Sequence, residues 1–259
     1  MTRLNWTTSR TVNLGPWSIP TMGELPGQQY GFSGIKPNSK VMLALKKLAW
    51  PLRKLRDDLL VDGFIEREVE RLFRKYYRQG DTCLEIGCGD LEMSRVVDGD
   101  WYNALDIRIS EFHLRRMLER NKRLNVVLAS ASDIPAGDAT VDVVISTETF
   151  TFIPDIDGAL KEIRRVMKTG GRLMCSIPNN FSHLYVRKGP NRDTLHEWSF
   201  DGFAGLMEDK GFRLLERSRA GWWVPTPKWL TDTAYTLPFT PRDEYRTTTF
   251  FYAFEAVDG

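Results

Sequence analysis

From residue 80 onward, short apolar segments alternate with longer amphipathic ones. The apolar segments predict seven strands, near 82–86, 101–106, 124–128, 141–146, 171–176, 212–217 and 247–256. Apolar residues at helical spacing predict helices near 90–97, 110–121, 156–168 and 199–210. Such alternation is typical of a doubly wound, Rossmann-like α/β fold, a mostly parallel seven-stranded sheet with helices on both faces. No helix is predicted between the last two strands, so we expect the last strand to be antiparallel, after a long insertion.

The first part of the chain does not follow this pattern. Residues 1–38 are rich in Gly, Pro, Ser, Thr and Asn, which predicts an irregular arm. Residues 39–60 combine helical apolar spacing with many lysines and arginines, which predicts a basic amphipathic helix, kinked at Pro51. Through residues 40–56 such a helix can contact a membrane surface or an acidic partner, or it can be a packed helix with a solvated charged face. Both explanations stay open.

The predicted organisation has two parts. Residues 1–60 form the arm and the basic helix, as a cap or a partner contact. Residues 61–259 form the main domain, which opens with a helix near 64–77 and is long enough to bury a full core. Insertions near 178–198 and 218–246 are expected to cover a substrate.

Charge and cysteine content exclude several classes of protein. A formal net charge of +2 lacks the basic excess of a dedicated nucleic-acid binder. The three cysteines, Cys83, Cys88 and Cys175, are too few and too unevenly spaced for a disulfide framework or a thiolate metal site, so no metal is expected. We expect a reducing, cytoplasmic setting, because the sequence shows neither a secretory signal nor a run of about 18 apolar residues that would span a membrane.

The stretch "CLEIGCGDLEMSR" predicts a strand that ends in a ligand-binding turn. Gly87 and Gly89 allow the backbone to approach a ligand at the carboxyl end of the strand. The dinucleotide fingerprint needs a third glycine where this chain has Glu92. Glu85 and Asp90 also lie beside the turn, and these carboxylates disfavour an anionic pyrophosphate. The turn is therefore better suited to a ligand that carries positive charge.

These residues resemble the first motif of the class I S-adenosylmethionine (SAM)-dependent methyltransferases, (Asp/Glu)-x-Gly-x-Gly-x-Gly. Glu85, Gly87 and Gly89 match it, and Leu91 departs at the third glycine. The resemblance continues through "WYNALDIRIS", "SASDIPAGDATVDVVIS" and "ALKEIRRVMKTGGRLMCSIPN", and covers about residues 76–212. Within the class, the chain is similar to type 11-like methyltransferases of quinone biosynthesis and small-molecule methylation. The resemblance implies SAM as cofactor and S-adenosylhomocysteine (SAH) as product.

It also implies roles for single residues. Asp106 would accept hydrogen bonds from the ribose hydroxyls, and Ile107 would lie against adenine. Asp133 would accept a hydrogen bond from the adenine amino group, and Ile134 would pack on the ring. The predicted cofactor site comprises Glu85, Gly87, Cys88, Gly89, Asp106, Ile107, Ser132, Asp133, Ile134 and Thr147. Each residue alone also has a structural explanation, such as a tight turn or a helix cap, and their order and separations favour the cofactor site.

The residues after the fourth predicted strand bear on the methyl acceptor. Many relatives have Glu-x-x-x-His here, whereas this chain keeps Glu148 and has Phe152 in place of the histidine. The predicted substrate pocket is rich in aromatic side chains and comprises Glu148, Phe150, Phe152, Trp198, Trp222 and Trp223. The aromatic residues of the 218–246 insertion could equally form a homodimer surface.

Two histidines are candidates for a general base. His196 lies in a segment that is expected to fold over the carboxyl edge of the sheet, and His183 precedes it by a short insertion. The alternative for His196 is a packed side chain or a contact at the start of a helix.

The leading functional hypothesis is methyl transfer from SAM to a small molecule, at a hydroxyl oxygen. A non-catalytic SAM-binding partner or regulatory protein is one alternative. An RNA or protein methyltransferase is another, although no Asn-Pro-Pro-Tyr-type sequence follows the fourth strand and no basic stripe indicates nucleic-acid binding.

Overall fold

A computed structural model describes most of the chain. The described residues are 2–8, 10–14, 17–21, 64–89, 101–109, 114, 123–183, 194–224, 235–237 and 243–258. Several predicted features lie outside them, namely the basic helix of residues 39–60, the helix near 90–97, most of the helix near 110–121, and Leu91.

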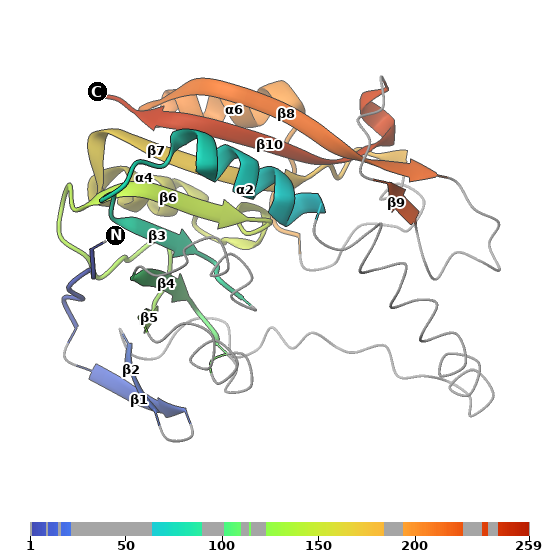
Figure 1. Ribbon diagram of the computed structural model, residues 1–259. Helices are drawn as coiled ribbons and strands as arrows, with labels where there is room; N and C mark the ends of the chain where they lie inside the picture. The colour runs from blue at the N-terminus through green and yellow to red at the C-terminus, as the bar shows by residue number, and fades with distance from the viewer. Residues whose placement is uncertain are drawn as a thin grey trace, which may run out of the picture.

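The described residues form a ten-stranded sheet in the order β1-β2-β5-β4-β3-β6-β7-β10-β8-β9 (Figure 1). The strands are β1 (Arg10–Leu14), β2 (Trp17–Thr21), β3 (Cys83–Ile86), β4 (Tyr102–Asp106), β5 (Leu124–Leu128), β6 (Val141–Thr147), β7 (Met167–Pro178), β8 (Phe212–Val224), β9 (Tyr235–Leu237) and β10 (Thr247–Ala256). Strands β3 to β7 are parallel, and β10 is antiparallel to both of its neighbours, β7 and β8.

The predicted fold class is confirmed. All seven predicted strands are present, as β3 to β8 and β10, and the last is antiparallel. From β3 the sheet extends to β4 and β5 on one side, and to β6 and β7 on the other. In a doubly wound sheet, ligands bind beyond the carboxyl ends of the strands where the order reverses. That place lies between the turns that follow β3 and β6.

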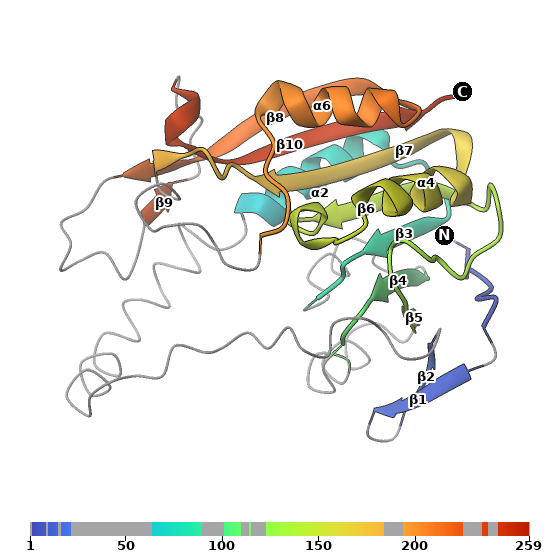
Figure 2. The same ribbon diagram turned by 180° about the vertical axis from the view of Figure 1, so that it is seen from behind.

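Helices cover both faces of the sheet. Helix α2 (Phe64–Tyr76) lies on one face, and α4 (Ile156–Val166) and α6 (Phe200–Asp209) lie on the other (Figures 1 and 2). The Asp155 and Ser199 side chains cap α4 and α6, since each accepts a hydrogen bond from the backbone N–H three residues on. Such caps satisfy donors that the first helical turn leaves without partners.

Two hydrophobic cores follow from the alternation of side chains along the strands. Leu84 belongs to the core under α4 and α6, together with helix residues such as Phe203. The preceding residue, Cys83, belongs to the core under α2, together with Leu72. The parallel strands are thus buried on both faces, which is why they read as continuous apolar runs.

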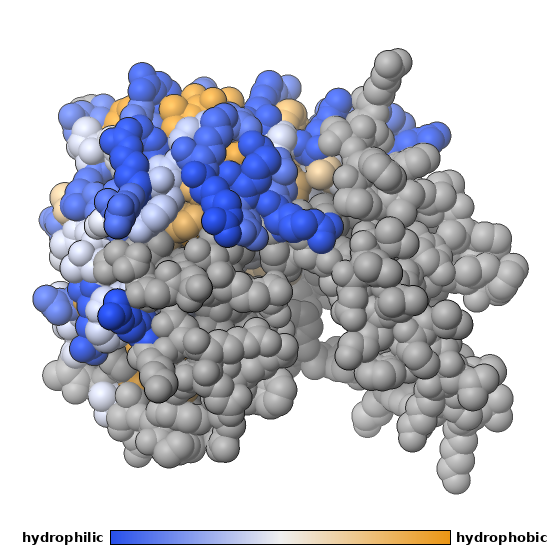
Figure 3. Space-filling view, in the orientation of Figure 1, coloured by the Kyte–Doolittle hydropathy of each residue, from blue (hydrophilic) through white to orange (hydrophobic). Residues whose placement is uncertain are grey.

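The outer face of α2 is hydrophilic (Figure 3). Ion pairs join this face to the sheet, because Arg71 and Lys75 both pair with Glu216 of β8. Burial opposes ionisation of Glu216, but hydrogen bonds from Lys75, Arg71 and Tyr76 outweigh it and hold the pKa of Glu216 at about 2. The pairs hold α2 against β8.

The N-terminal part differs from the prediction of an irregular arm over residues 1–38. Strands β1 and β2 form an antiparallel hairpin, and Thr21 of β2 pairs in parallel with Leu128 of β5. The prediction is therefore wrong for these strands. The hairpin pairs residues close in sequence, but its place in the sheet depends on Leu128, more than 100 residues from Thr21, and local composition carries little of that information.

An N-terminal strap, residues 2–8, is held by two buried asparagines at the start of β4 and β5. Asn103 Oδ1 accepts a hydrogen bond from the Leu4 N–H at 2.9 Å, and Asn103 Nδ2 donates to the Thr2 carbonyl at 3.0 Å. Asn125 Nδ2 donates to the Leu4 carbonyl at 2.9 Å. The Leu4 side chain is 5% exposed and belongs to the core under α4. The strap therefore packs against the sheet, with Leu4 in the core.

The insertion before the last strand begins as a continuation of the sheet. Strand β8 is longer than predicted and reaches Val224, and β9 pairs with its end, Trp222 opposite Leu237. Trp222 and Trp223 thus lie in β8. None of the helices in the described ranges is long and apolar enough to cross a membrane.

Candidate cofactor site and active site

The cofactor turn begins at Gly87, directly after β3. Gly87 has a backbone φ of +72°, which glycine adopts without steric cost. A Cβ atom here would lie 2.2 Å from Thr149 Oγ1 and 2.7 Å from Thr149 Cβ. Because Thr149 follows β6, the missing side chain lets the turns after β3 and β6 pack together. Thr149 is not among the predicted site residues, since no local pattern in the sequence shows which residue faces the glycine.

Gly89 has a different environment. Its φ is +42°, and a Cβ atom built on it would have no described atom within 4 Å. Its N–H donates to Asp106 Oδ2 at 2.8 Å. The turn therefore leaves open space beside a carboxylate.

Backbone groups hold both carboxylate oxygens of Asp106, the last residue of β4. Oδ2 accepts from Gly89, and Oδ1 accepts from the Arg108 N–H at 2.9 Å. Burial raises the pKa of Asp106, and these hydrogen bonds offset the rise only in part. Each oxygen has a second lone pair, so two hydroxyl donors could bind here and would favour the charged form.

Other predicted cofactor residues lie after β4 and β5. Ile107 is 44% exposed, and so its side chain can lie against a planar ligand. Ser132 is half-buried and Asp133 is exposed. Ile134 is only 2% exposed and belongs to the core under α4, so its predicted contact with adenine is corrected. An apolar residue beside a site can pack inward or outward, and here it packs inward.

Residues close to the two turns are more buried. Glu85 and Cys88 are each 3% exposed. Burial raises the pKa of the Cys88 thiol, so this side chain is a neutral core group and only its backbone borders the turn. Thr147 is the half-buried end of β6, and Glu148 has a φ of +53°, which is uncommon for a residue with a side chain. The Glu148 N–H donates to both the carbonyl and the hydroxyl of Ser176, which holds this turn in place.

His196 lies before α6 and is bound to the chain around the 3-10 helix η3 (Phe150–Phe152). His196 Nε2 lies 2.9 Å from the Ile153 carbonyl oxygen, and the His196 backbone N–H donates to the Thr151 carbonyl at 3.3 Å. The ring stacks on Trp198 with centroids 5.3 Å apart. A carbonyl only accepts hydrogen bonds, so in the neutral ring Nε2 carries the proton and Nδ1 can accept one.

The two phenylalanines of η3 have different surroundings. Phe150 is fully buried and packs against Phe203, with ring centroids 5.8 Å apart, so its predicted place in the pocket wall is corrected. Phe152 is 38% exposed and can line a pocket. His183 is exposed after β7, with its ring 5.9 Å from that of Tyr245. Among the described residues there is no group of three or more His, Cys, Asp and Glu that could hold a metal ion.

A sheet reversal point, a glycine turn and a half-buried carboxylate beside it are together features of a Rossmann-like protein that binds a nucleoside cofactor. Residues 84–175 match a family model described as a methyltransferase domain. The 2-methyl-6-phytyl-1,4-hydroquinone methyltransferase of Synechocystis sp. is 32% identical over 173 residues, which cover 58% of this chain and 52% of that protein. The 27-O-demethylrifamycin SV methyltransferase of Amycolatopsis mediterranei is 33% identical over 103 residues, 37% of this chain and 38% of that protein.

The fold is also similar to that of solved structures. One chain of a complex that contains the Haloferax volcanii methyltransferase activator Trm112 superposes with a TM-score of 0.61 at 23% identity, over 79% of this chain and 93% of that chain. Together with the matched methyltransferase domain, the relatives support for this chain a class I SAM-dependent methyltransferase with SAM as cofactor. It spans about half the length of the first curated relatives it matches.

The described residues fit this cofactor. SAM carries a ribose with two hydroxyls, which suit the Asp106 carboxylate, and an adenine, which suits the exposed side chain of Ile107. A Cβ atom on Gly89 would meet no described atom within 4 Å, so the described residues leave room for a ligand beside Asp106. SAM has a positive sulfonium and no phosphate, so the buried carboxylate of Glu85 near the turn is compatible with it.

The affinity for SAH should depend on pH through Asp106. Hydroxyl donors favour the charged carboxylate, so binding should be strongest above the pKa of Asp106 and weaken by up to about tenfold per pH unit below it. Because burial raises this pKa, the weakening should begin above the ordinary aspartate range near about 3.9. Calorimetric titrations over a series of pH values test this. The same weakening in Asp106→Ala would contradict the assignment.

Proposed function

We propose that this chain transfers a methyl group from SAM to a small, largely apolar acceptor at a hydroxyl oxygen, in the cytoplasm. The observation that carries the proposal is the position of the large apolar side chains that the described residues expose, Ile107, Phe152, Phe181, Leu195 and Tyr245. The first three residues follow β4, β6 and β7, in that order. Leu195 precedes α6 and Tyr245 precedes β10. All five positions lie at the carboxyl edge of the parallel strands.

An apolar rim at this edge is suited to a substrate that presents a ring or a hydrocarbon chain. Exposed apolar side chains gathered in one place usually mark an interaction site. The printed names of two relatives support the same class of acceptor, since one acts on a phytyl hydroquinone and the other on a demethylrifamycin. The second name specifies an oxygen as the site that lacks the methyl group.

SAM supplies a methyl group bonded to a positively charged sulfur. The residues of the chain have the remaining tasks of holding the cofactor, orienting the acceptor oxygen and excluding water. Asp106, Gly89 and Ile107 would hold the nucleoside. His196 Nδ1 would accept the proton of the acceptor hydroxyl as the oxygen bonds to the methyl carbon and the carbon–sulfur bond breaks, which leaves the sulfur with the electron pair as the neutral thioether of SAH. The Ile153 carbonyl would keep the ring in the required tautomer.

Turnover measurements test the proposal. The protein is incubated with methyl-labelled SAM and a panel of phenols, hydroquinones and hydroxylated macrocycles, and mass spectrometry locates the label on oxygen, carbon or nitrogen. Protein and RNA acceptors serve as comparison substrates. We expect label on the oxygen of at least one apolar small molecule. Binding of SAM without transfer to any acceptor would favour the regulatory alternative.

His196→Ala should lower kcat by about a hundredfold if this residue is the general base. The variant should also lose the acid limb of the pH–rate profile, because no imidazole would be left to protonate. His183→Ala is the control, since His183 is exposed near Tyr245. An unchanged profile in His196→Ala would assign the ring to packing against Trp198, whereas loss of the acid limb in His183→Ala would move the role to His183.

A further inference from the structure

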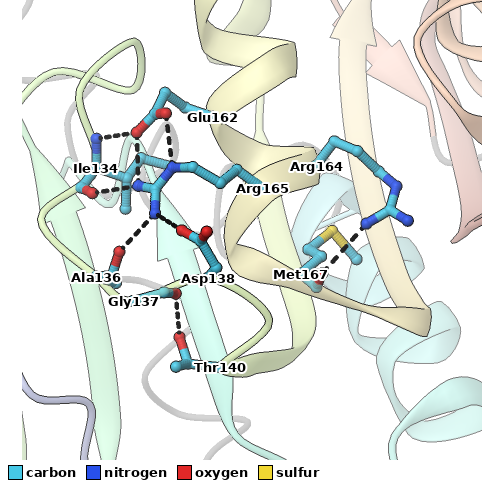
Figure 4. Close-up of polar contacts among 9 residues, drawn as sticks. All are labelled: Ile134, Ala136, Gly137, Asp138, Thr140, Glu162, Arg164, Arg165 and Met167. Atoms are coloured by element: carbon cyan, nitrogen blue, oxygen red, sulfur yellow. Dashed lines mark hydrogen bonds and ion pairs between the residues drawn. The ribbon is translucent and has the colours of Figure 1, made fainter. Parts of the chain in front are cut away.

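Residues 130–138 form a loop that joins β5 to β6 and carries Asp133. No helix lies in this connection, so the loop depends on side chains from elsewhere for a fixed shape. Two residues of α4, Glu162 and Arg165, supply these contacts (Figure 4).

Arg165 uses all five of its N–H donors in this region. Nη2 donates to the Ile134 carbonyl and Nη1 to the Ala136 carbonyl, both at 2.9 Å. Nη1 also donates to Asp138 Oδ1 at 2.6 Å. The remaining donors are Nε–H, which binds Glu162 Oε1, and the second N–H of Nη2, which binds Glu162 Oε2, each at 2.7 Å. The guanidinium therefore fixes three residues of the loop to one helix.

Glu162 binds the other polar backbone group of Ile134, its N–H. Its Oε2 accepts a hydrogen bond from the Ile134 N–H at 3.0 Å. Both polar backbone groups of Ile134 are thus bound by α4, and the Ile134 side chain is buried in the core. Asp133 is the residue directly before this fixed point and is itself exposed. The backbone beside the exposed Asp133 side chain is therefore held in place.

We infer that Glu162 and Arg165 are positioning residues that direct Asp133 toward the adenine amino group. This inference rests on the proposed function, because it requires SAM or SAH in the site. A lysine cannot replace Arg165, since an ammonium places its three donors at one point and cannot reach two carbonyls and two carboxylates together.

Discrimination of adenine tests the inference. Calorimetry compares SAH with an SAH analogue that has hydrogen in place of the 6-amino group. The unmodified protein should prefer SAH by about tenfold, the value of one hydrogen bond to a charged acceptor. Asp133→Ala should bind both ligands about equally, and Arg165→Met and Arg165→Lys should reduce the preference to about threefold or less. The double variant Asp133→Ala/Arg165→Met should bind SAH no more weakly than Asp133→Ala.

Arg164→Met is the matched control. Arg164 is the neighbouring residue of α4, but its Nη2 donates to the Val257 carbonyl at 2.8 Å and its Nη1 to the Met167 carbonyl at 3.3 Å, and neither belongs to the loop (Figure 4 shows the second contact). This variant should keep the preference of about tenfold even if its melting temperature falls. If Arg165→Met does not fold, Glu162→Gln makes the same comparison with a side chain of unchanged size.

The outcomes separate the two levels of inference. A preference retained in Arg165→Met, or in Glu162→Gln where that variant replaces it, would overturn the positioning role. An unmodified protein that binds SAH but does not distinguish the analogue would overturn it as well, and would leave the proposed function intact. Failure of the unmodified protein to bind SAH at all would overturn both.

Discussion

Gly87→Ala should lower the free energy of unfolding by about 2–5 kcal/mol, a large part of the total stability of a typical domain. A residue with a Cβ atom pays about 1–2 kcal/mol in the left-handed backbone conformation that Gly87 adopts. The new Cβ atom would also overlap Thr149, with atoms as close as 2.2 Å, and forced overpacking costs about 1–3 kcal/mol more. Chemical denaturation of the purified variant measures the sum.

Gly89→Ala is the matched control for this prediction. Its φ is also positive, but a Cβ atom there meets no described atom within 4 Å, so the variant should lose only the backbone cost of about 1–2 kcal/mol. It should instead weaken SAH binding, because the added methyl group occupies the ligand space. Thr149→Ala should recover part of the stability of Gly87→Ala, since it removes two of the three overlapping atoms and keeps the Cβ atom. Equal destabilisation by the two alanines would contradict this division of roles.

Asp106→Ala should weaken SAH binding by about 1–3 kcal/mol, roughly 5- to 150-fold in affinity. The variant removes the acceptor for both ribose hydroxyls. It also leaves the N–H groups of Gly89 and Arg108 without their carboxylate partner, which loosens the turn that faces the ligand. Calorimetry at neutral pH gives the affinity directly.

Asp258→Ala is the control for loss of a carboxylate. Asp258 follows the end of β10, at the opposite edge of the sheet, where it accepts a hydrogen bond from Thr169 Oγ1 at 2.6 Å. The affinity of the Asp258→Ala variant for SAH should equal that of the unmodified protein. If Asp106→Ala also binds SAH with full affinity, the ribose site does not lie at the end of β4.

The central sheet could be predicted because each strand buries both faces. Leu84 packs in the core under α4, and its neighbour Cys83 packs in the core under α2. Both positions are therefore apolar, and the segment reads as one apolar run. The Gly87 turn could be predicted for a similar reason. Backbone conformation and the absence of a side chain are local properties, and glycine spacing records them.

The direction in which a side chain packs was less predictable. Phe150 and Phe152 are the same residue type two positions apart, yet the first is fully buried and the second is 38% exposed. Ile107 and Ile134 differ in the same way, since the first is 44% exposed and the second 2%. Composition and spacing describe both members of each pair equally well. Only the packing of neighbouring elements separates a core residue from a pocket residue.

The sequence was sufficient for the positions of the central strands, the antiparallel last strand and the class of cofactor, because these depend on local periodicity and on one short motif. The three-dimensional fold was needed for the strap of residues 2–8, the hairpin of β1 and β2, and the clamp of Glu162 and Arg165 on the Asp133 loop. The polar contacts of the strap and the clamp join backbone groups to side chains about 30 to 120 residues away. Each of these backbone groups bonds to a partner that the fold brings near, so the spacing of residues in the sequence does not predict the contact.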